Sequence, residues 1–280
     1  MRSALGAPTI QRTMGDSGMG AVVARWRHGD ASIVGGADDA AHIVLSLSSG
    51  QSVEQRLKGD TKQLTATVGS FCVLPPGEAV ITHVKGLADA LHIFVPLRMM
   101  QAIHGPVPPH IAPACYSTNP DIRRDCLEIL VALRRRCSDG NLQERIFHLA
   151  QVLVKQSAIA PPMPARAGLA PAAMRRVTEL IDARINGDIA VPLTLGDMAE
   201  AARLSADHFA RMFRQDTGTT PYLYISRRRL ERAMTLLTTP AASVGEVADR
   251  TGFCSPSHFV SSFRRHLGVT PASFREAILP

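Results

Sequence analysis

The sequence predicts a chain of two domains, in which a strand-rich N-terminal domain ending in a helical hairpin is followed by an all-α C-terminal domain. Three observations predict this class. Stretches before about residue 100 alternate apolar and polar residues, the region to about residue 157 places apolar residues at helical spacing, and a Pro- and Ala-rich segment then precedes a purely helical pattern. With 280 residues, 45% of them hydrophobic, the chain is long enough to form two hydrophobic cores.

Strands are expected where every second residue is apolar, because successive side chains of a strand point to opposite faces of the sheet. The alternating residues are Ile43, Leu45 and Leu47 in one stretch and Leu64, Ala66 and Val68 in another. A further strand is expected at the short apolar run Ala90–Val95, which His92 interrupts.

Two helices are expected after the strands, over about residues 119–136 and 141–157. Each carries apolar residues three or four positions apart, which places them on one face of a helix. These residues are Ile122, Cys126, Ile129, Leu130 and Leu133 in the first helix and Leu142, Ile146, Leu149 and Leu153 in the second. We therefore expect an N-terminal domain over 1–157, a linker over 158–173 and a C-terminal domain over 174–280.

Composition and charge narrow the possible functions. A net charge of +7 favours an anionic partner, although charge alone does not separate nucleic acid from an acidic membrane. No window contains the ~18 apolar residues of a membrane span, and the first twenty residues lack the layout of a secretory signal. The five cysteines are scattered without a CxxC pair. We therefore expect a cytoplasmic protein with free thiols, no membrane contact, no metal and no cofactor.

The C-terminal domain contains an internal repeat. The segment Ser205–Pro221 returns fifty positions later as Ser255–Pro271, with Ser, His, two Phe, Arg, Gly, Thr and Pro at matching places. Upstream, Thr194–Ala199 matches Ser243–Ala248 at an offset of 49, so the second copy has one extra residue in its turn. Repetition this dense indicates two copies of one structural unit.

Each copy begins with the pattern of a capped helix. Thr194 with Asp197, and Ser243 with Glu246, have the spacing of capping boxes, in which two side chains satisfy amides at a helix start. One largely apolar face follows in each helix, formed by Leu195, Met198, Ala199 and Ala202 in the first copy and by Val244, Val247, Ala248 and Thr251 in the second.

A second helix follows in each copy after a short turn. Ser205 and Ser255 are expected to cap it, and Gly218 and Gly268 to end it. Its apolar face consists of two i, i+4 pairs, Phe209 with Phe213 and Phe259 with Phe263. Each copy is therefore expected to form a helix-turn-helix unit.

This pattern resembles the AraC/XylS family of bacterial regulators, whose DNA-binding domain carries two helix-turn-helix units joined by one long helix. The resemblance covers about Val177–Arg275. Matching residues include Met198, Ala199, Ser205, Arg211, Phe213, Arg214, Gly218 and Pro221 in the first unit, Tyr224, Ile225, Arg229, Leu230 and Ala233 in the connection, and Val247, Ala248, Gly252, Phe259, Phe263, Arg264, Gly268, Pro271 and Phe274 in the second unit. The resemblance implies a regulator that binds double-stranded promoter DNA, acts with RNA polymerase and responds to a small-molecule effector.

The residues that face DNA follow from the rotation of the second helix of each unit. At about 100° per residue, Arg211 and Ser261 lie opposite the buried phenylalanines and should point outward. We expect bases to be read by Ala206, Asp207, His208, Arg211, Ser257, His258, Ser261 and Ser262. We expect phosphates to be bound by Ser205, Arg214, Arg227, Arg228, Ser255, Arg264 and Arg265.

Two departures from the family pattern affect this expectation. Arg203 stands where the first turn often has Gly, and Ser261 stands where the second recognition helix often has Arg. Arg211 can form two hydrogen bonds with one guanine, whereas Ser261 offers a single undemanding hydroxyl. The two units should therefore recognise unequal half-sites.

The N-terminal domain resembles the cupin barrels at Gly69–Gly77. Cupin enzymes usually have a metal-binding His three residues after that last Gly, but Val80 stands there and no HxH pair precedes it, so we do not expect an enzyme. Four residues could line an effector pocket, namely Trp26, His42, His83 and His92, although such histidines are also commonly packed or solvent-facing.

Two further possibilities stay open. By family resemblance, Leu142, Ile146, Leu149 and Leu153 could form the interface of a homodimer, or they could pack within their own domain. A cupin-type enzyme, or a DNA-repair protein with the same helical module, would be the alternative to a regulator.

Overall fold

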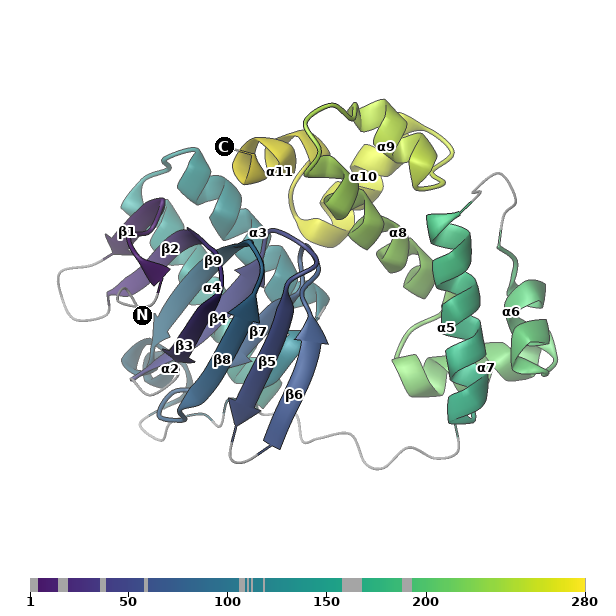
Figure 1. Ribbon diagram of the computed structural model, residues 1–280, viewed down its shortest axis with the longest axis horizontal. Helices are drawn as coiled ribbons and strands as arrows, with labels where there is room; N and C mark the ends of the chain where they lie inside the picture. The colour runs from purple at the N-terminus through teal and green to yellow at the C-terminus, as the bar shows by residue number, and fades with distance from the viewer. Residues whose placement is uncertain are drawn as a thin grey trace. The chain divides into compact units, whose positions relative to one another are not determined.

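The computed structural model describes residues 5–14, 20–35, 39–57, 60–105, 109, 111, 113–117, 119–157, 168–187 and 193–279 (Figure 1). It divides into two compact units, one formed by Met1–Ala160 with Phe263–Pro280 and the other by Pro161–Ser262. The division after residue 160 falls in the expected linker, most of which lies outside the described residues. The segment from Phe263 onward belongs to the first unit, which the repeat pattern does not predict.

The described strands of the first unit form two antiparallel sheets. The larger sheet has the order β1-β2-β9-β4-β7-β10 and the smaller one β3-β8-β5-β6. Their bounds are β1 Ile10–Met14, β2 Ala21–His28, β3 Ala31–Gly35, β4 Ala40–Ser46, β5 Ser52–Leu57, β6 Asp60–Thr65, β7 Phe71–Leu74, β8 Val80–Lys85, β9 Ala88–Pro96 and β10 Ala114–Ser117. The expected strands at 43–47 and 90–95 are β4 and β9, and the stretch from Leu64 to Val68 begins in β6 but its buried Ala66 and Val68 follow the strand.

The larger sheet is buried on both faces, which its long apolar runs require. One face packs against the smaller sheet in a core that includes Trp26 from β2, Ile33 from β3 and Val84 from β8. Residues of the opposite face, such as Ile43 and Ile93, are fully buried as well. This double burial places β9, which pairs with both β2 and β4, at the centre of the unit.

The described helices in the N-terminal part of this unit are α2 Leu97–His104, α3 Pro120–Arg134 and α4 Asp139–Ser157. Asn119 caps α3 by accepting hydrogen bonds from the amides of Asp121 and Ile122. All nine apolar residues that the sequence places on the faces of α3 and α4 are buried, and the two helices pack against each other. The two-sheet arrangement agrees with a strand-rich domain, and the cupin identity stays a prediction.

The remaining helices are α5 Pro171–Asn186, α6 Leu195–Ala202, α7 Ala206–Thr217, α8 Pro221–Leu237, α9 Val244–Arg250, α10 Pro256–Leu267 and α11 Pro271–Ile278. The core around α5, α6 and α7 contains Val177, Ile181, Met198, Phe209 and Phe213. Helix α5 begins three residues before the expected start because Pro171 is tolerated in the first turn. Within the described residues no helix is long and apolar enough to cross a bilayer.

Candidate nucleic-acid interface

The starts of α6 and α9 are fixed by two complete capping boxes. The Thr194 hydroxyl accepts a hydrogen bond from the Asp197 amide at 3.2 Å, and the Asp197 carboxylate accepts one from the Thr194 amide at 2.8 Å. Ser243 and Glu246 make the same pair of bonds at 3.1 and 2.6 Å. These backbone donors hold the pKa of both carboxyl groups below its ordinary value. Both expected capping boxes are thus confirmed.

The two turns differ by one residue, and the structure locates it. Arg203 and Gly252 occupy equivalent left-handed positions, with φ of 62° and 74°. The amide of the next residue donates back to the first helix in both, from Leu204 to Ala199 at 2.9 Å and from Phe253 to Ala248 at 3.1 Å. Because the backbones match up to Leu204 and Phe253, the extra residue of the second turn is Cys254.

The second helix of each unit is oriented by its phenylalanines. Phe209, Phe213, Phe259 and Phe263 are all completely buried, as the repeat predicts. The Phe209 and Phe213 rings lie 5.3 Å apart, and Tyr224 of α8 meets Phe213 edge-on at 5.2 Å. In the second unit, Phe253 packs on Phe259 at 5.1 Å.

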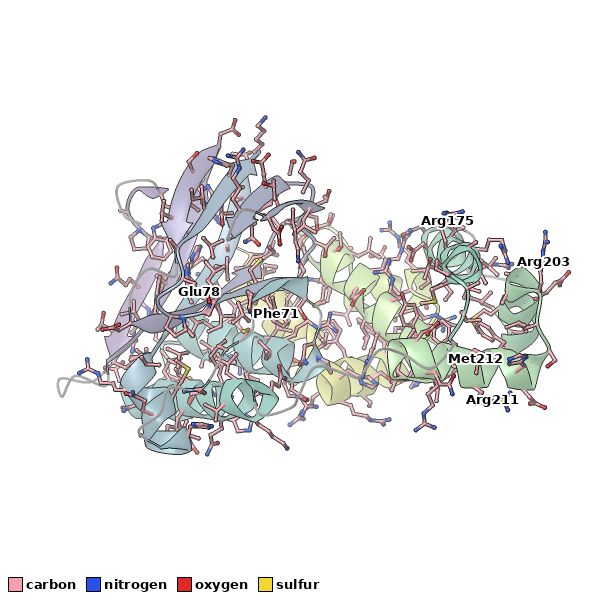
Figure 2. All side chains as sticks on the ribbon, turned by 90° about the horizontal axis from the view of Figure 1, so that it is seen from below. Phe71, Glu78, Arg175, Arg203, Arg211 and Met212 are labelled. Atoms are coloured by element: carbon pink, nitrogen blue, oxygen red, sulfur yellow. The ribbon has the colours of Figure 1, made fainter. Side chains whose placement is uncertain are left out.

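Opposite those rings, both helices present an exposed polar face. The exposed residues are Ala206, Asp207, His208 and Arg211 on α7, and Ser257, His258 and Ser261 on α10. Arg211 projects from the surface of its unit (Figure 2). Ser262 is a correction, because it is only 5% exposed and cannot reach a base. It lies three residues after Phe259 and therefore shares the buried side of α10.

The two exposed faces are not equivalent near their N-terminal ends. The Ser255 hydroxyl accepts a hydrogen bond from the His258 amide, whereas the Ser205 side chain makes no capping bond although it occupies the cap position. The His258 ring lies 3.2 Å from the Cys254 sulfur and packs edge-on against Phe253. The extra residue of the second turn thus contacts an expected base-reading side chain.

The expected phosphate ligands separate into two groups. Arg214, Arg264 and Arg265 are exposed, whereas Arg227 and Arg228 are half-buried. Arg228 is a correction, since its guanidinium binds Asp182 at 2.6 Å and Glu231 at 2.8 Å. Burial opposes its charge, but these two carboxylates outweigh burial and raise the pKa of Arg228. The Arg228 guanidinium therefore links α8 to Asp182 of α5 by an ion pair and is not free to bind phosphate.

Neighbouring arginines of α8 also serve its packing. Arg229 donates to the Gly252 carbonyl at 2.9 Å, and Arg232 donates to the Asn186 side chain at the end of α5. Burial lowers the pKa of Arg229. These bonds tie the connecting helix to the second turn and to α5, as a rigid spacer between two helix-turn-helix units requires.

One apolar position of the first helix-turn-helix unit faces solvent. Leu195, expected on the apolar face of α6, is 39% exposed and borders a groove of about 760 Å³ that Tyr222 and Arg211 also line. Leu195 is the first residue of α6, where no preceding turn covers it. Met198, Ala199 and Ala202 are buried as expected.

The four expected effector-pocket residues do not all come together. His42, His92 and Trp26 are buried and in contact, since the His92 ring lies 4.8 Å from Trp26 and 5.1 Å from His42. His83 instead bonds to the Ser32 hydroxyl at 2.8 Å and lines a separate hollow with Glu54 and Lys85. Its strand β8 contributes Thr82 and Val84 to the inner face, so His83 points the other way.

The expected dimer residues are buried inside their own unit. Leu142, Ile146, Leu149 and Leu153 are at most 3% exposed. Side chains buried in this way cannot contact a second copy while α3 and α4 stay packed. The structure therefore favours the intrachain alternative and corrects the assignment of these residues to a homodimer interface.

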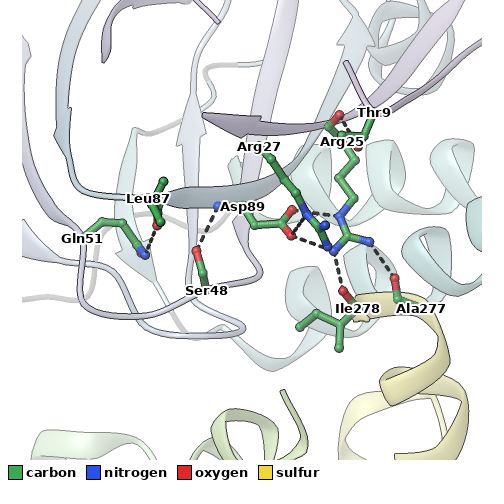
Figure 3. A network of polar contacts seen from close by, with 9 residues as sticks. All are labelled: Thr9, Arg25, Arg27, Ser48, Gln51, Leu87, Asp89, Ala277 and Ile278. Atoms are coloured by element: carbon green, nitrogen blue, oxygen red, sulfur yellow. Dashed lines mark hydrogen bonds and ion pairs between the residues drawn. The ribbon is translucent and has the colours of Figure 1, made fainter. Parts of the chain in front are cut away.

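A contact that the sequence did not indicate joins β2 to the last helix of the chain (Figure 3). Arg25 is 3% exposed and binds both carboxylate oxygens of Asp89, at 2.8 and 2.7 Å. The same guanidinium donates to the carbonyls of Ala277 and Ile278 at the end of α11. The sequence signal of this contact is weak, because Arg25 stands in an apolar stretch of β2 but is followed by Arg27 in the same strand.

The C-terminal part of the chain is similar to helix-turn-helix domains of known proteins. A family model described as a helix-turn-helix domain matches residues 198–277. The chain is 34% identical over 84 residues to the HTH-type transcriptional regulator YdeC of Bacillus subtilis, covering 30% of this chain and 29% of that protein. It is 39% identical over 79 residues to the HTH-type transcriptional activator RhaS of Escherichia coli, covering 28% of each.

A similar share of the chain resembles a solved structure. A transcriptional regulator from Chromobacterium violaceum with an AraC-type DNA-binding domain is 32% identical, with a TM-score of 0.34, over 37% of this chain and 88% of that one. The chain spans less than a third of the length of the curated relatives YdeC and RhaS, so the likeness concerns one domain.

The paired units, their buried phenylalanines and the connecting helix define a DNA-binding domain with two helix-turn-helix units. Together with the family match, they show that the C-terminal part of the chain is a helix-turn-helix domain similar to those of the transcriptional regulators YdeC and RhaS.

Proposed function

We propose that the protein is a transcription regulator that binds promoter DNA in the cytoplasm through α7 and α10. The observation that carries the proposal is the orientation of these two helices. Each buries its phenylalanines completely and exposes an opposite polar face, which includes Arg211 on α7 and Ser261 on α10. A helix with this division can lie in a major groove while its apolar side stays in the protein core.

The two helices should recognise unequal half-sites. Arg211 can donate two hydrogen bonds to guanine O6 and N7, which discriminates against other bases by ~1–3 kcal/mol. Ser261 can make only a weaker, less selective contact. In addition, His258 is held by Cys254 and Phe253 in the second unit. We therefore assign most sequence discrimination to α7.

Affinity should come from exposed arginines outside the base-reading faces. Arg214, Arg264 and Arg265 are suitable phosphate ligands, because charge-assisted contacts with phosphate strengthen binding at every sequence. Arg227 stays a predicted ligand, and Arg228 is excluded by its two carboxylate partners. The complex of the protein with promoter DNA would act together with RNA polymerase.

The strand-rich part of the first unit is proposed to sense a small molecule. Its effect could reach DNA binding through the segment 263–279, which packs with the sheets and α3 in one unit. Arg25 holds the end of α11, and Arg135, the residue after α3, contacts Glu276 of α11 at 3.3 Å. An effector would act only if it bound one arrangement of this segment more tightly than another.

Selection of binding sites from random DNA tests the proposed function. The wild-type protein should enrich two adjacent half-sites, one with a strongly selected guanine. Arg211→Ala should relax selection at that guanine and leave the other positions unchanged, while Ser261→Ala should do little. Arg175→Ala is the matched control, because Arg175 is an exposed arginine on α5 whose one ion pair within the described residues is with Glu179. Enrichment of no sequence by the wild-type protein, or equal losses in the Arg211 and Ser261 variants, would contradict the proposal.

A further inference from the structure

A cavity lies between the two sheets of the first unit. Its walls include His42 and His92 from the larger sheet and Gln55 and Thr82 from the smaller one. Its volume is about 50 Å³, whereas one water molecule needs roughly 10–15 Å³ on the same measure. The cavity is therefore large enough for a molecule of a few heavy atoms.

Two imidazoles in the cavity wall form one coupled pair. His42 Nε2 lies 2.9 Å from His92 Nδ1, and both rings are at most 2% exposed. Stacking of His42 on Phe94 and the edge of Trp26 against His92 fix both rings in place. Burial lowers the pKa of His42 to about 3 and lowers that of His92 well below its ordinary value, so both rings are neutral at pH 7.

This neutral pair always presents one hydrogen-bond donor and one acceptor. If His92 donates its Nδ1 proton, His42 carries its own proton on Nδ1 and His92 Nε2 becomes an acceptor. If His42 donates, the roles of the two outer nitrogens are exchanged. Among the described residues neither outer nitrogen, His42 Nδ1 nor His92 Nε2, has a hydrogen-bond partner.

Gln55 adds a second acceptor. Its amide nitrogen makes long contacts with the Thr82 hydroxyl at 3.5 Å and the Cys72 sulfur at 3.6 Å, while its oxygen has no partner within the described part of the chain. A buried polar atom without a partner costs free energy that a matching ligand would recover. One donor and two acceptors are thus left without partners on described residues that line the cavity.

The described wall of the cavity contains one carboxylate and, besides the imidazole pair, the histidine His28. The one carboxylate in its wall belongs to Asp89, which is bound by Arg25 and Arg27 at 2.7 Å. Asp89 pairs in register with Arg27 on the opposite face of β9 from His92. An ion entering the cavity would lose its hydration without gaining an opposite charge.

We propose that this cavity binds a small uncharged ligand whose polar group offers two hydrogen-bond donors and one acceptor, as a primary carboxamide does. His42 and His92 supply the donor and one acceptor, and Gln55 Oε1 supplies the other acceptor. This inference rests on the sensing role proposed above and specifies the chemical class that the sensor accepts. The switchable tautomers of the pair allow the same site to take the carboxamide in either orientation.

Nitrogen NMR of the full-length protein tests the proposal, with propionamide and propionate as probes of equal shape and different charge. Propionamide should shift the imidazole nitrogen signals of His42 and His92 and saturate. Propionate should bind at least tenfold more weakly. Equal binding of both probes, or unshifted imidazole signals at saturating propionamide, would overturn the proposal.

A matched pair of variants tests the Gln55 contact. Gln55→Met keeps the shape and should weaken propionamide binding several-fold, because one hydrogen bond is lost. Gln63→Met removes an exposed glutamine from the neighbouring strand β6 and should have no effect. Unchanged affinity in a folded Gln55→Met variant would contradict the assignment. DNA binding measured without propionamide separates the two proposals. A protein that binds propionamide but no DNA would contradict the regulator function and leave the ligand proposal intact.

Discussion

Arg203 occupies a position whose left-handed backbone conformation is unfavourable for most side chains. It ends α6 in the left-handed conformation, with φ of 62°, which brings Cβ close to the following carbonyl oxygen. The equivalent position of the second unit is Gly252, which has no Cβ and adopts φ of 74° without this cost. The first helix-turn-helix unit therefore carries backbone strain that the second helix-turn-helix unit avoids. Figure 2 shows the Arg203 side chain pointing into solvent, where it gains little contact to offset that strain.

Arg203→Gly should consequently stabilise the first helix-turn-helix unit by about 1 kcal/mol, because it removes the left-handed penalty at one position. Hydrogen exchange of the α6 amides in native conditions would measure the change. Gly252→Ala is the reverse control and should destabilise by a similar amount. A destabilised Arg203→Gly variant would mean that the arginine side chain makes a contribution larger than the strain.

The buried imidazoles give the first unit a pH dependence with a definite sign. In the unfolded chain each histidine has a pKa near 6.5, whereas burial lowers the pKa of His42 to about 3 in the folded protein. The folded state thus binds fewer protons than the unfolded state between these values. The stabilising contribution is complete above pH ~6.5 and is lost as pH falls towards 3.

The free energy of unfolding of the first unit should therefore decrease between about pH 7 and pH 5. Urea unfolding at several pH values would measure this decrease. His42→Gln removes one titrating group and should flatten the dependence, whereas His83→Gln should not, because His83 is paired with Ser32 outside the cavity. A His42→Gln variant whose stability depends on pH as steeply as that of the wild-type protein would contradict the burial of a neutral His42 ring.

At the scale of helices and strands, local signals predicted the C-terminal units better than the N-terminal domain. The capping boxes and phenylalanine pairs depend on residues within one helix, so spacing alone is sufficient to place them. Strands β1, β2, β3, β5, β7, β8 and β10 were not individually expected, since their pairing depends on distant partners. The same reason explains Arg228, whose partner Asp182 lies 46 residues earlier in the chain.

The contrast between Arg214 and Arg228 makes this distinction measurable. Arg214 is exposed at the end of α7, so Arg214→Ala should reduce the slope of log affinity against log salt by about 1 and leave stability unchanged. Arg228→Ala should leave the slope unchanged and destabilise the packing of α8 on α5, because Asp182 loses its partner. DNA titrations at several salt concentrations and thermal unfolding would provide the two readouts. The opposite assignment of effects would show that Arg228 is the phosphate ligand.

At the scale of the whole chain, β9 connects the proposed ligand cavity to the last helix. His92 lines the cavity on one face of this strand, and three residues earlier Asp89 binds Arg25 on the other face. Arg25 in turn holds the carbonyl end of α11, where a positive charge is also favoured by the helix dipole. A small shift of β9 on ligand binding would therefore reach the segment that contains α11. This path was not predictable, because it joins residues about 250 positions apart.

Arg25→Met should break the path while keeping an apolar side chain of similar length. The amides in the last turn of α11 should exchange faster, and DNA affinity should become independent of any effector that changes it in the wild-type protein. Arg27→Met is the matched control, since Arg27 also binds Asp89 but makes no hydrogen bond to the described residues of α11. Hydrogen exchange and DNA titration would measure both effects. Equal responses of the two variants would exclude a specific role for Arg25.

The central claim is that α7 and α10 both enter DNA with their phenylalanines turned inward. Hydroxyl-radical footprinting of the full-length protein on a selected site tests it most directly. The account expects two protected patches on one face of the duplex, about one helical turn or ~34 Å apart, with Arg211→Ala weakening the patch that contains the selected guanine. A single protected patch, or two patches unaffected by Arg211→Ala, would contradict it.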